Sequence, residues 1–366
     1  MFPDRVKVIV VGGGPAGATA ARRLAENSID VCLVERDISH RKPCGGGVPS
    51  ILFKEFSIPD DLPYRAIRRI SIVSPSGKRL EIMLKGGELR TIDRMKFDAR
   101  LRGLAERAGS IMVEGTLTGL TVDKTIKAII NTGQGKKEIK ADYLIAADGV
   151  NSTVRRLLGI KPVDTVYTLS GRYRSIHTDS CEFWFSRKHA PMFYSWVFPG
   201  VDKSSVGTGT IEPKRATRYF EEFLKRRGDI ISENTRLRGY KVPLWDGKLF
   251  RYKRVLFVGD AAAQVMPMTF EGIYYAMKSA EYAAESIINN KLSLYKKLWK
   301  GRFQSRFRFM KLLQYFFFRS DENAERLIEV FSNQDIQDLS MRLWLNKEQS
   351  RGTLISFIKQ LGKFLN

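Results

Sequence analysis

The sequence predicts an α/β fold that combines a parallel-sheet domain, an antiparallel-sheet domain and a helical C-terminal region. Three observations carry this prediction. Residues 6–35 follow the order strand, glycine turn, helix, strand, which is typical of a βαβ unit. Residues 166–211 contain short strands rich in aromatic side chains, and the stretch from residue 291 is helical and strongly basic.

The elements follow in order from the apolar patterns. A β-branched run at Val6–Val11 predicts a strand that is buried on both faces. The remaining predicted elements are a helix at 16–27, a strand at 29–34, strands within 65–85, a helix at 94–108, strands within 111–146, a helix at 214–227, a strand at 254–258 and a helix at 271–289. The sequence contains no internal repeat and no obvious linker, so separated segments must come together on folding.

The composition limits the class of protein. With 366 residues, 43% hydrophobic and 28% charged, the chain can form two or three domains with real cores. No apolar run approaches about 20 residues, and the N-terminus opens into a strand, so we expect neither a spanning helix nor a signal peptide. Three cysteines without CxxC spacing favour a reducing interior, and three histidines argue against a His-based metal site. The predicted location is cytoplasmic.

Positive charge is concentrated near the C-terminus. The formal net charge is +23, and Lys291–Arg319 contains nine basic residues and no acidic one. Aromatic and aliphatic residues alternate with these cations, a pattern that suits a helix lying at the inner face of a membrane. The alternative is a helix that packs its apolar face on the protein and leaves a basic face in water. Both interpretations are compatible. Nucleic-acid binding is the weaker one, because no nucleic-acid motif is present.

A glycine turn at the end of the first strand is the strongest local signal. Gly12, Gly14 and Gly17 have GxGxxG spacing, and the following helix would present its N-terminus to a phosphate. Glu35 ends the next strand, where a carboxylate would bind ribose hydroxyls and repel a 2′-phosphate, which disfavours NADP. The alternative is a structural turn beside a surface glutamate. The strand–turn–helix context favours dinucleotide binding.

Two later motifs also follow apolar strands. Asp148–Gly149 and Gly259–Asp260 lie where the C-terminal ends of parallel strands meet a ligand. An acid there can bond a ribityl hydroxyl, and the helix that opens near Gly272 can face a flavin edge. Each dipeptide alone would be an ordinary turn. In this order and spacing, the three motifs resemble the flavin-dependent aromatic-hydroxylase superfamily, which implies FAD and a Rossmann-type FAD-binding domain.

Two further motifs narrow the resemblance to the geranylgeranyl reductase family. Pro43–Gly47 resembles that family's CGGG loop, and Pro191–Pro199 matches its PxxYxWxFP motif at every fixed position. The resemblance covers about residues 5–290. One departure is Ala263–Gln264, where the family often has glycine after GDAA. The resemblance implies cofactor contacts at Ala16, Glu35, Gly45, Gly47, Arg94, Asp260, Gly272 and Ile273, and at the backbone near Leu117. The predicted cofactor residues also include Gly12, Gly14 and Gly17 of the glycine turn, together with Arg36 and Cys44.

The second motif agrees with a lipid substrate. Residues two apart share one face of a strand, so Tyr194, Trp196 and Phe198 would line one wall, and an aromatic wall suits an isoprenoid chain. By periodicity alone these residues are more simply core, and the family resemblance favours substrate binding instead. Cys44 could position the substrate or supply a proton, and the alternative is an inert thiol. Cys32 and Cys181 are expected in the core.

The predicted organisation is a discontinuous FAD-binding domain with an antiparallel-sheet substrate domain and a helical C-terminal region. The expected boundaries are 1–165 for the first part of the FAD-binding domain, with 60–90 contributing to the substrate domain, then 166–250 for the substrate sheet, 251–290 for the last FAD-binding part, and 291–366 for the basic helices.

The resemblance implies an FAD-dependent reductase that saturates C=C bonds of a polyprenyl chain in a lipid, quinone or polyprenol. Cys44 and Tyr194 are the catalytic candidates, because one alkene carbon needs a proton. The alternatives are a flavin monooxygenase for an apolar or aromatic substrate, and a prenyl-lipid binding flavoprotein without turnover. No second GxGxxG is found, so the electron donor, NAD(P)H or a ferredoxin, stays open.

Overall fold

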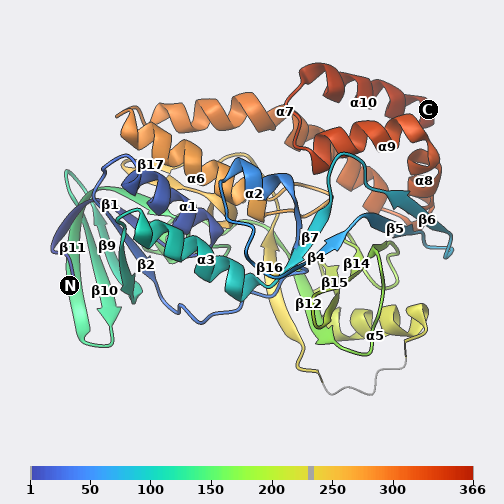
Figure 1. Cartoon of the computed structure of the whole chain (residues 1–366), viewed down its shortest axis with the longest axis horizontal. Helices are drawn as coiled ribbons and strands as arrows, with labels where there is room; N and C mark the ends of the chain where they lie inside the picture. The colour runs from blue at the N-terminus through green and yellow to red at the C-terminus, as the bar shows by residue number, and fades with distance from the viewer. Residues whose placement is uncertain (1, 230–234, 366) are drawn as a thin grey trace. The chain divides into compact units, whose positions relative to one another are not determined.

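The computed structural model describes residues 2–229 and 235–365, which form two compact units (Figure 1). Each unit is assembled from three separate stretches of the chain. Unit 1 comprises Met1–Arg41, Met95–Thr165 and Val242–Arg308, and unit 2 comprises Lys42–Arg94, Val166–Lys241 and Phe309–Asn366.

Unit 1 is built on an eight-stranded sheet. Its strands are β1 (Arg5–Val11), β2 (Val31–Glu35), β8 (Ile111–Glu114), β9 (Thr116–Val122), β10 (Ile126–Thr132), β11 (Gly135–Ala146), β17 (Arg251–Tyr252) and β18 (Val255–Phe257). The order is β17-β18-β11-β1-β2-β8, and from β18 to β8 every pair is parallel. Strands β9 and β10 extend β11 as an antiparallel meander. This is the Rossmann-type arrangement that the sequence predicts.

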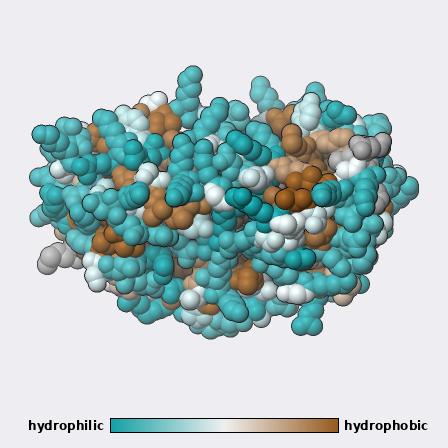
Figure 2. Space-filling view, turned by 90° about the horizontal axis from the view of Figure 1, so that it is seen from above, coloured by the Kyte–Doolittle hydropathy of each residue, from teal (hydrophilic) through white to brown (hydrophobic). Residues whose placement is uncertain are grey.

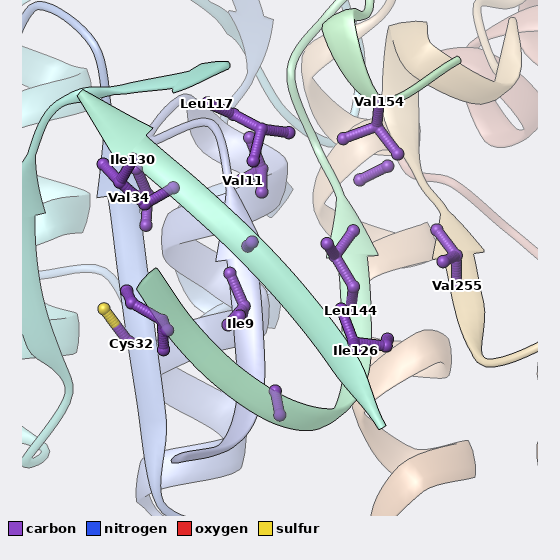
Figure 3. Close-up of a cluster of buried hydrophobic side chains, with 14 of the residues drawn as sticks. Ile9, Val11, Cys32, Val34, Leu117, Ile126, Ile130, Leu144, Val154 and Val255 are labelled. Atoms are coloured by element: carbon purple, nitrogen blue, oxygen red, sulfur yellow. The ribbon is translucent and has the colours of Figure 1, made fainter. Parts of the chain in front are cut away.

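One face of the parallel strands packs on the meander. Ile9, Cys32 and Leu144 meet Leu117 of β9 and Ile130 of β10 in one buried cluster (Figure 3). Helix α1 lies against β1, β2 and β11, and α6 packs along α1. The helical segments of unit 1 are α1 (Pro15–Ala25), α3 (Arg94–Arg107, whose first residue belongs to unit 2), α4 (Thr153–Leu157), η2 (Gly259–Ala262) and α6 (Ile273–Ile288).

Unit 2 contains a seven-stranded sheet in the order β16-β12-β15-β14-β13-β5-β6. Its strands are β5 (Arg69–Val73), β6 (Arg79–Met83), β12 (Thr165–Tyr173, whose first residue belongs to unit 1), β13 (Cys181–Trp184), β14 (Ser195–Phe198), β15 (Ser204–Thr210) and β16 (Arg238–Pro243, whose last two residues belong to unit 1). The pairs from β12 to β13 are antiparallel, as is β5–β6, whereas β13 and β5 run parallel. A small sheet joins β3 (Gly47–Pro49), β7 (Leu89–Ile92) and β4 (Tyr64–Ile67), and α2 spans Ile51–Glu55.

Helix α5 (Ala216–Arg227), preceded by η1 (Pro213–Arg215), covers one face of the seven-stranded sheet. Phe220 and Phe223 of α5 join Trp184 of β13 in a second hydrophobic cluster. Arg227, the last residue of α5, donates from Nε to the buried carboxylate of Glu182 at 3.1 Å. Because Glu182 and Trp184 share this face of β13, Phe183 must point to the opposite face.

The C-terminal part is helical, as predicted. It consists of α7 (Ser293–Phe318), α8 (Asp321–Ser332), α9 (Gln334–Ser340), η3 (Met341–Leu345) and α10 (Arg351–Leu365). Residues of α7 up to Arg308 belong to unit 1 and those from Phe309 onward to unit 2. Among the described residues, no helix combines the length and the apolar character needed to cross a bilayer.

The α/β fold class expected from the sequence is confirmed. The domain boundaries expected from the sequence stay a prediction.

Candidate functional site

The turn after β1 is shaped by its glycines. Gly12 has φ +101°, and a Cβ built on it would lie 2.5 Å from the carbonyl oxygen of Ala147. A Cβ on Gly17 would lie only 1.7 Å from the carbonyl oxygen of Gly12. Gly14, the residue before α1, has nothing within 4 Å of its Cβ position, so the chain is open there. The helix N-terminus can therefore accept a phosphate at Gly14, while Gly12 and Gly17 allow the close packing.

Glu35 is held at this turn by backbone donors. The Gly13 amide donates to Oε2 of Glu35, and the Asp37 amide donates to Oε1 at 3.2 Å. Arg102 of α3 reaches the same place and donates to the carbonyl oxygens of Gly13 at 3.2 Å and Ile38 at 2.8 Å. The sequence prediction missed Arg102, because nothing in the sequence of a distant helix marks it as a partner of the Gly13 and Ile38 carbonyls. The neighbouring Arg36, also a predicted contact, is exposed.

The Asp148–Gly149 motif forms a half-buried turn that leads into α4. Asp148 accepts a hydrogen bond from the Val154 amide at 2.9 Å, and Ser152 caps α4 by accepting from the Arg155 amide at 3.1 Å. Burial raises the pKa of the Asp148 carboxyl above its usual range. Because the Ala147 carbonyl meets the Gly12 position, the turn after β11 lies directly beside the turn after β1.

The Gly259–Asp260 turn lies beside the first helix as well. A Cβ on Gly259 would lie 3.4 Å from Cβ of Ala16, and a Cβ on Gly272 would lie 3.5 Å from Oδ1 of Asp260. Ile273 begins α6, and its preceding residue Gly272 brings no capping side chain. Unit 1 therefore brings together the turns after β1, β11 and β18, as expected for the carboxyl ends of parallel strands.

The departure from the family pattern at Ala263–Gln264 has a structural explanation. Ala263 is in the left-handed region with φ +54°, a conformation that normally favours glycine. Gln264 accepts from the Gly259 amide at 3.0 Å and donates to the Tyr295 hydroxyl at 2.7 Å. That hydroxyl donates to the carbonyl oxygen of Phe257 at 2.7 Å. The turn therefore keeps the glycine-like conformation and is secured by a buried side-chain network.

Leu117, a predicted cofactor residue of unit 1, has a side chain that packs in the hydrophobic core. It is buried in the cluster between β9 and the parallel strands (Figure 3). Its side chain is therefore a core residue, and only its backbone is available for the predicted contact.

In unit 2, the Cys44–Gly47 loop lies directly on Phe198. A Cβ on Gly45 would lie 2.6 Å from the Phe198 ring, and one on Gly47 would lie 3.3 Å from it. Gly46 has φ +83° and donates its amide to Sγ of Cys44 at 3.3 Å. The two motifs that suggested the family therefore contact each other, although about 150 residues separate them in the sequence.

The predicted aromatic wall lies on the sheet face opposite α5. Phe183 faces Trp196 in the β13–β14 register, and its ring lies 5.2 Å from the rings of both Tyr194 and Phe198. Tyr194 and Trp196 are buried, whereas Phe198 is half-buried. The first two are thus core residues as well as wall residues. Phe183 was missed, although its position in an alternating strand Cys181–Phe185 was a usable signal.

The neighbouring strand β15 leaves room for these rings. Gly207 faces Trp196, and a Cβ there would lie 2.3 Å from the indole. A Cβ on Gly209 would lie 2.3 Å from the ring of Phe193. The indole nitrogen of Trp196 donates to Ser205 at 3.3 Å. The rings therefore pack directly on backbone.

The remaining predicted residues are placed as follows. Arg94 is buried at the first residue of α3, and Cys44 is half-buried. Cys32 and Cys181 are fully buried strand residues, which confirms their predicted core positions.

The first half of α7 is packed into unit 1. Tyr295, Trp299, Phe303 and Phe307 follow each other at intervals of four residues, and each is at most 1% exposed. The Tyr275 ring lies 5.0 Å from that of Phe307 and 5.3 Å from that of Phe303. These aromatics therefore belong to the core, which is the second of the two interpretations that the sequence left open.

Comparison with known proteins agrees with the motifs. A family model described as pyridine nucleotide-disulphide oxidoreductase matches residues 6–189. A geranylgeranyl diphosphate reductase from Arabidopsis thaliana is 31% identical, the alignment covering 97% of this chain and 83% of the relative. A digeranylgeranylglycerophospholipid reductase from Methanosarcina mazei is 33% identical, with 77% of this chain and 75% of the relative covered.

Two solved structures share the fold. A geranylgeranyl bacteriochlorophyll reductase-like protein from Thermoplasma acidophilum has a TM-score of 0.85 at 24% identity, covering 98% of this chain and all of that one. The flavin-dependent brominase Bmp2 has a TM-score of 0.78 at 16% identity, covering 98% of this chain and 99% of that one. Since relatives above 30% identity are matched over most of their length, the chain belongs to the geranylgeranyl reductase family of oxidoreductases.

Proposed function

We propose that the chain is an FAD-dependent reductase that saturates carbon–carbon double bonds of a polyprenyl chain. The observation that carries the proposal is the contact between the Cys44–Gly47 loop and Phe198. A loop without side chains at three consecutive positions can approach a flat ring, and Phe198 continues into an aromatic surface suited to an apolar chain. The family members that the chain resembles are named as prenyl-chain reductases, which supports the same substrate class.

The residues of unit 1 fit a flavin dinucleotide. The open Gly14 position at the start of α1 suits a pyrophosphate, and Glu35 suits the hydroxyls of an adenosine ribose. Asp260 lies beside the Gly272–Ile273 end of α6, where an acid and the N-terminal end of a helix suit a ribityl chain and a charged ring edge. We propose FAD contacts at all the positions expected from the sequence, including Arg36, Arg94, Leu117 (through its backbone) and the glycine loop of unit 2.

When bound and reduced, FAD supplies the hydride for one carbon of the double bond. The protein must hold the alkene in place, exclude water and supply a proton to the other carbon. We assign the proton to Sγ of Cys44 or to the hydroxyl of Tyr194, directly or through water. The Gly46 amide that donates to Sγ orients the thiol. Tyr194 is buried between Phe183 and Phe185, so its ring position is fixed.

The first test concerns the cofactor. Purified protein should show flavin absorption, and the compound released on heating should have the mass of FAD. A colourless protein that does not bind added FAD would refute the proposal at this step.

The second test concerns the reaction. Protein reduced with dithionite is incubated with a geranylgeranyl lipid, and the product should gain two hydrogens for each bond saturated. Cys44→Ser and Tyr194→Phe should lower the rate while flavin content is retained, and Tyr252→Phe, at a tyrosine that is 37% exposed in unit 1, is the matched control. A product heavier by one oxygen would indicate a monooxygenase, and tight lipid binding without turnover would indicate a carrier. Comparing NADPH, NADH and a reduced ferredoxin in place of dithionite identifies the donor.

A further inference from the structure

The C-terminal helices of unit 2 separate acidic from basic residues. Helices α8 and α9 carry the acidic side chains, and several of these contact the sheet of the same unit. Glu325 accepts from Ser76 Oγ at 3.0 Å, Asp338 pairs with Lys85 at 3.2 Å, and Asp321 accepts from the Arg187 amide at 2.6 Å. Acidic side chains of α8 and α9 therefore bind other parts of unit 2.

Helix α10 and the end of α7 have the opposite character. Neither α10 nor residues 309–319 contain an acidic residue. Their basic side chains are exposed at Lys311, Arg319, Arg351, Lys359 and Lys363. Helix α8 contacts both α10 and strands β5 and β6. Helix α10 packs mainly on α9 and also touches α8, and it presents positive charge with no acidic residue of its own.

The same two helices expose large apolar side chains. Leu312 and Tyr315 on α7 are 68% and 64% exposed, and Ile355 and Ile358 on α10 are 52% and 41% exposed. Each pair has i, i+3 spacing and so shares one face of its helix. The Phe309 and Phe357 rings, 5.9 Å apart, join the two helices. We call these four side chains the C-terminal apolar face. Figure 2 shows several groups of hydrophobic side chains among hydrophilic ones on this side of the molecule.

We propose that the C-terminal apolar face docks unit 2 on an anionic lipid bilayer. Exposed apolar side chains flanked by cations are the combination that an interfacial helix needs, because the apolar groups enter the headgroup boundary while the cations meet lipid phosphates. A second copy of this chain is the less suitable occupant, since pairing this face with itself would bring basic residues against basic residues. The residues of this face differ from the buried aromatics in the first half of α7, and their binding to lipid does not depend on the proposed reaction.

The test is sedimentation of the full chain with vesicles. We expect binding to vesicles that contain phosphatidylglycerol, little binding to pure phosphatidylcholine, and weaker binding as salt is raised. The double variant Ile355→Ser/Ile358→Ser should weaken binding by on the order of tenfold. Lys359→Glu/Lys363→Glu should weaken it by at least about fivefold for each residue.

The matched control is Met83→Ser/Val201→Ser, which removes two apolar side chains of unit 2 that are 58% and 54% exposed and lie outside this face. Equal losses for the control and for the α10 variant would overturn the proposal, as would an absence of vesicle binding at low salt. Sedimentation equilibrium without lipid tests whether a second copy of the chain occupies this face. A dimer that Ile355→Ser/Ile358→Ser dissociates would also overturn the proposal. All the substituted side chains are exposed, and circular dichroism checks that each variant folds.

Discussion

The hydroxyl of Tyr295 offers a sharp test of the network around the Gly259 turn. Tyr295→Phe keeps the ring and removes one oxygen. That oxygen accepts from Gln264 and donates to the Phe257 carbonyl, both at 2.7 Å, and Tyr295 and Gln264 are at most 1% exposed. Burial raises the pKa of the Tyr295 hydroxyl, so it stays a donor even at alkaline pH.

The expected loss follows from the groups left behind. Removing the hydroxyl leaves one buried donor and one buried acceptor without this partner, and each such group costs about 1–3 kcal/mol. Allowing for some relaxation, we expect the free energy of unfolding to fall by about 2–4 kcal/mol. Tyr315→Phe is the matched control, because Tyr315 lies on the same helix and is 64% exposed. It should change the stability by less than about 0.5 kcal/mol.

The assay is urea unfolding followed by both tryptophan fluorescence and circular dichroism, since a chain with two compact units can depart from two-state behaviour. Adding Gln264→Leu gives a double-mutant cycle, in which the two changes should couple by at least about 0.5 kcal/mol. A loss for Tyr295→Phe no larger than that for Tyr315→Phe, or strict additivity with Gln264→Leu, would refute the reasoning.

Three further outcomes are expected. Gly17→Ala should abolish flavin binding, because the new Cβ would lie 1.7 Å from the carbonyl oxygen of Gly12. Gly14→Ala has nothing within 4 Å of its Cβ, so this variant should fold normally and only weaken flavin retention. Equal flavin content in the two variants would contradict this reasoning. Gly45→Ala should reduce turnover of the prenyl substrate more than stability, because the Phe198 ring 2.6 Å away must move, as steady-state kinetics beside thermal melting would show. Burial lowers the pKa of His189 to about 3, so below about pH 6.5 the unfolded chain binds one more proton than the folded chain. The free energy of unfolding should therefore fall by about 2 kcal/mol between pH 7.5 and pH 5. His189→Gln should lose this part of the pH dependence.

The sequence reveals the features of this fold that local rules determine. The strand–turn–helix around Gly12–Gly17 depends on backbone conformation within a few residues, so spacing alone predicts it. The contact between the Cys44 loop and Phe198 was not predictable from either motif, because it depends on how β14 is ordered in the sheet. The family resemblance pointed to both motifs without placing them together.

Other features escaped for the same physical reason. Arg102 supports the Gly13 turn through backbone carbonyls, which leave no trace in a sequence pattern. Amphipathic periodicity in α7 correctly indicated a helix, but it could not tell an apolar stripe that faces protein from one that faces lipid. The buried Trp299 and the exposed Leu312 carry the same hydrophobic signal and lie in opposite environments. Only the tertiary fold separates them.

The two glycines of strand β15 have a consequence for protein engineering. At Gly207 and Gly209 the Trp196 indole and the Phe193 ring pack directly on the main chain of β15. The position of these two rings is therefore set by the backbone and not by a side chain that could move. A single methyl group added at Gly207 would lift the Trp196 indole instead of filling a void. Successively larger residues at position 207 would therefore displace the indole by increasing amounts. Such a series offers a way to change the width of the ligand that the aromatic surface accepts.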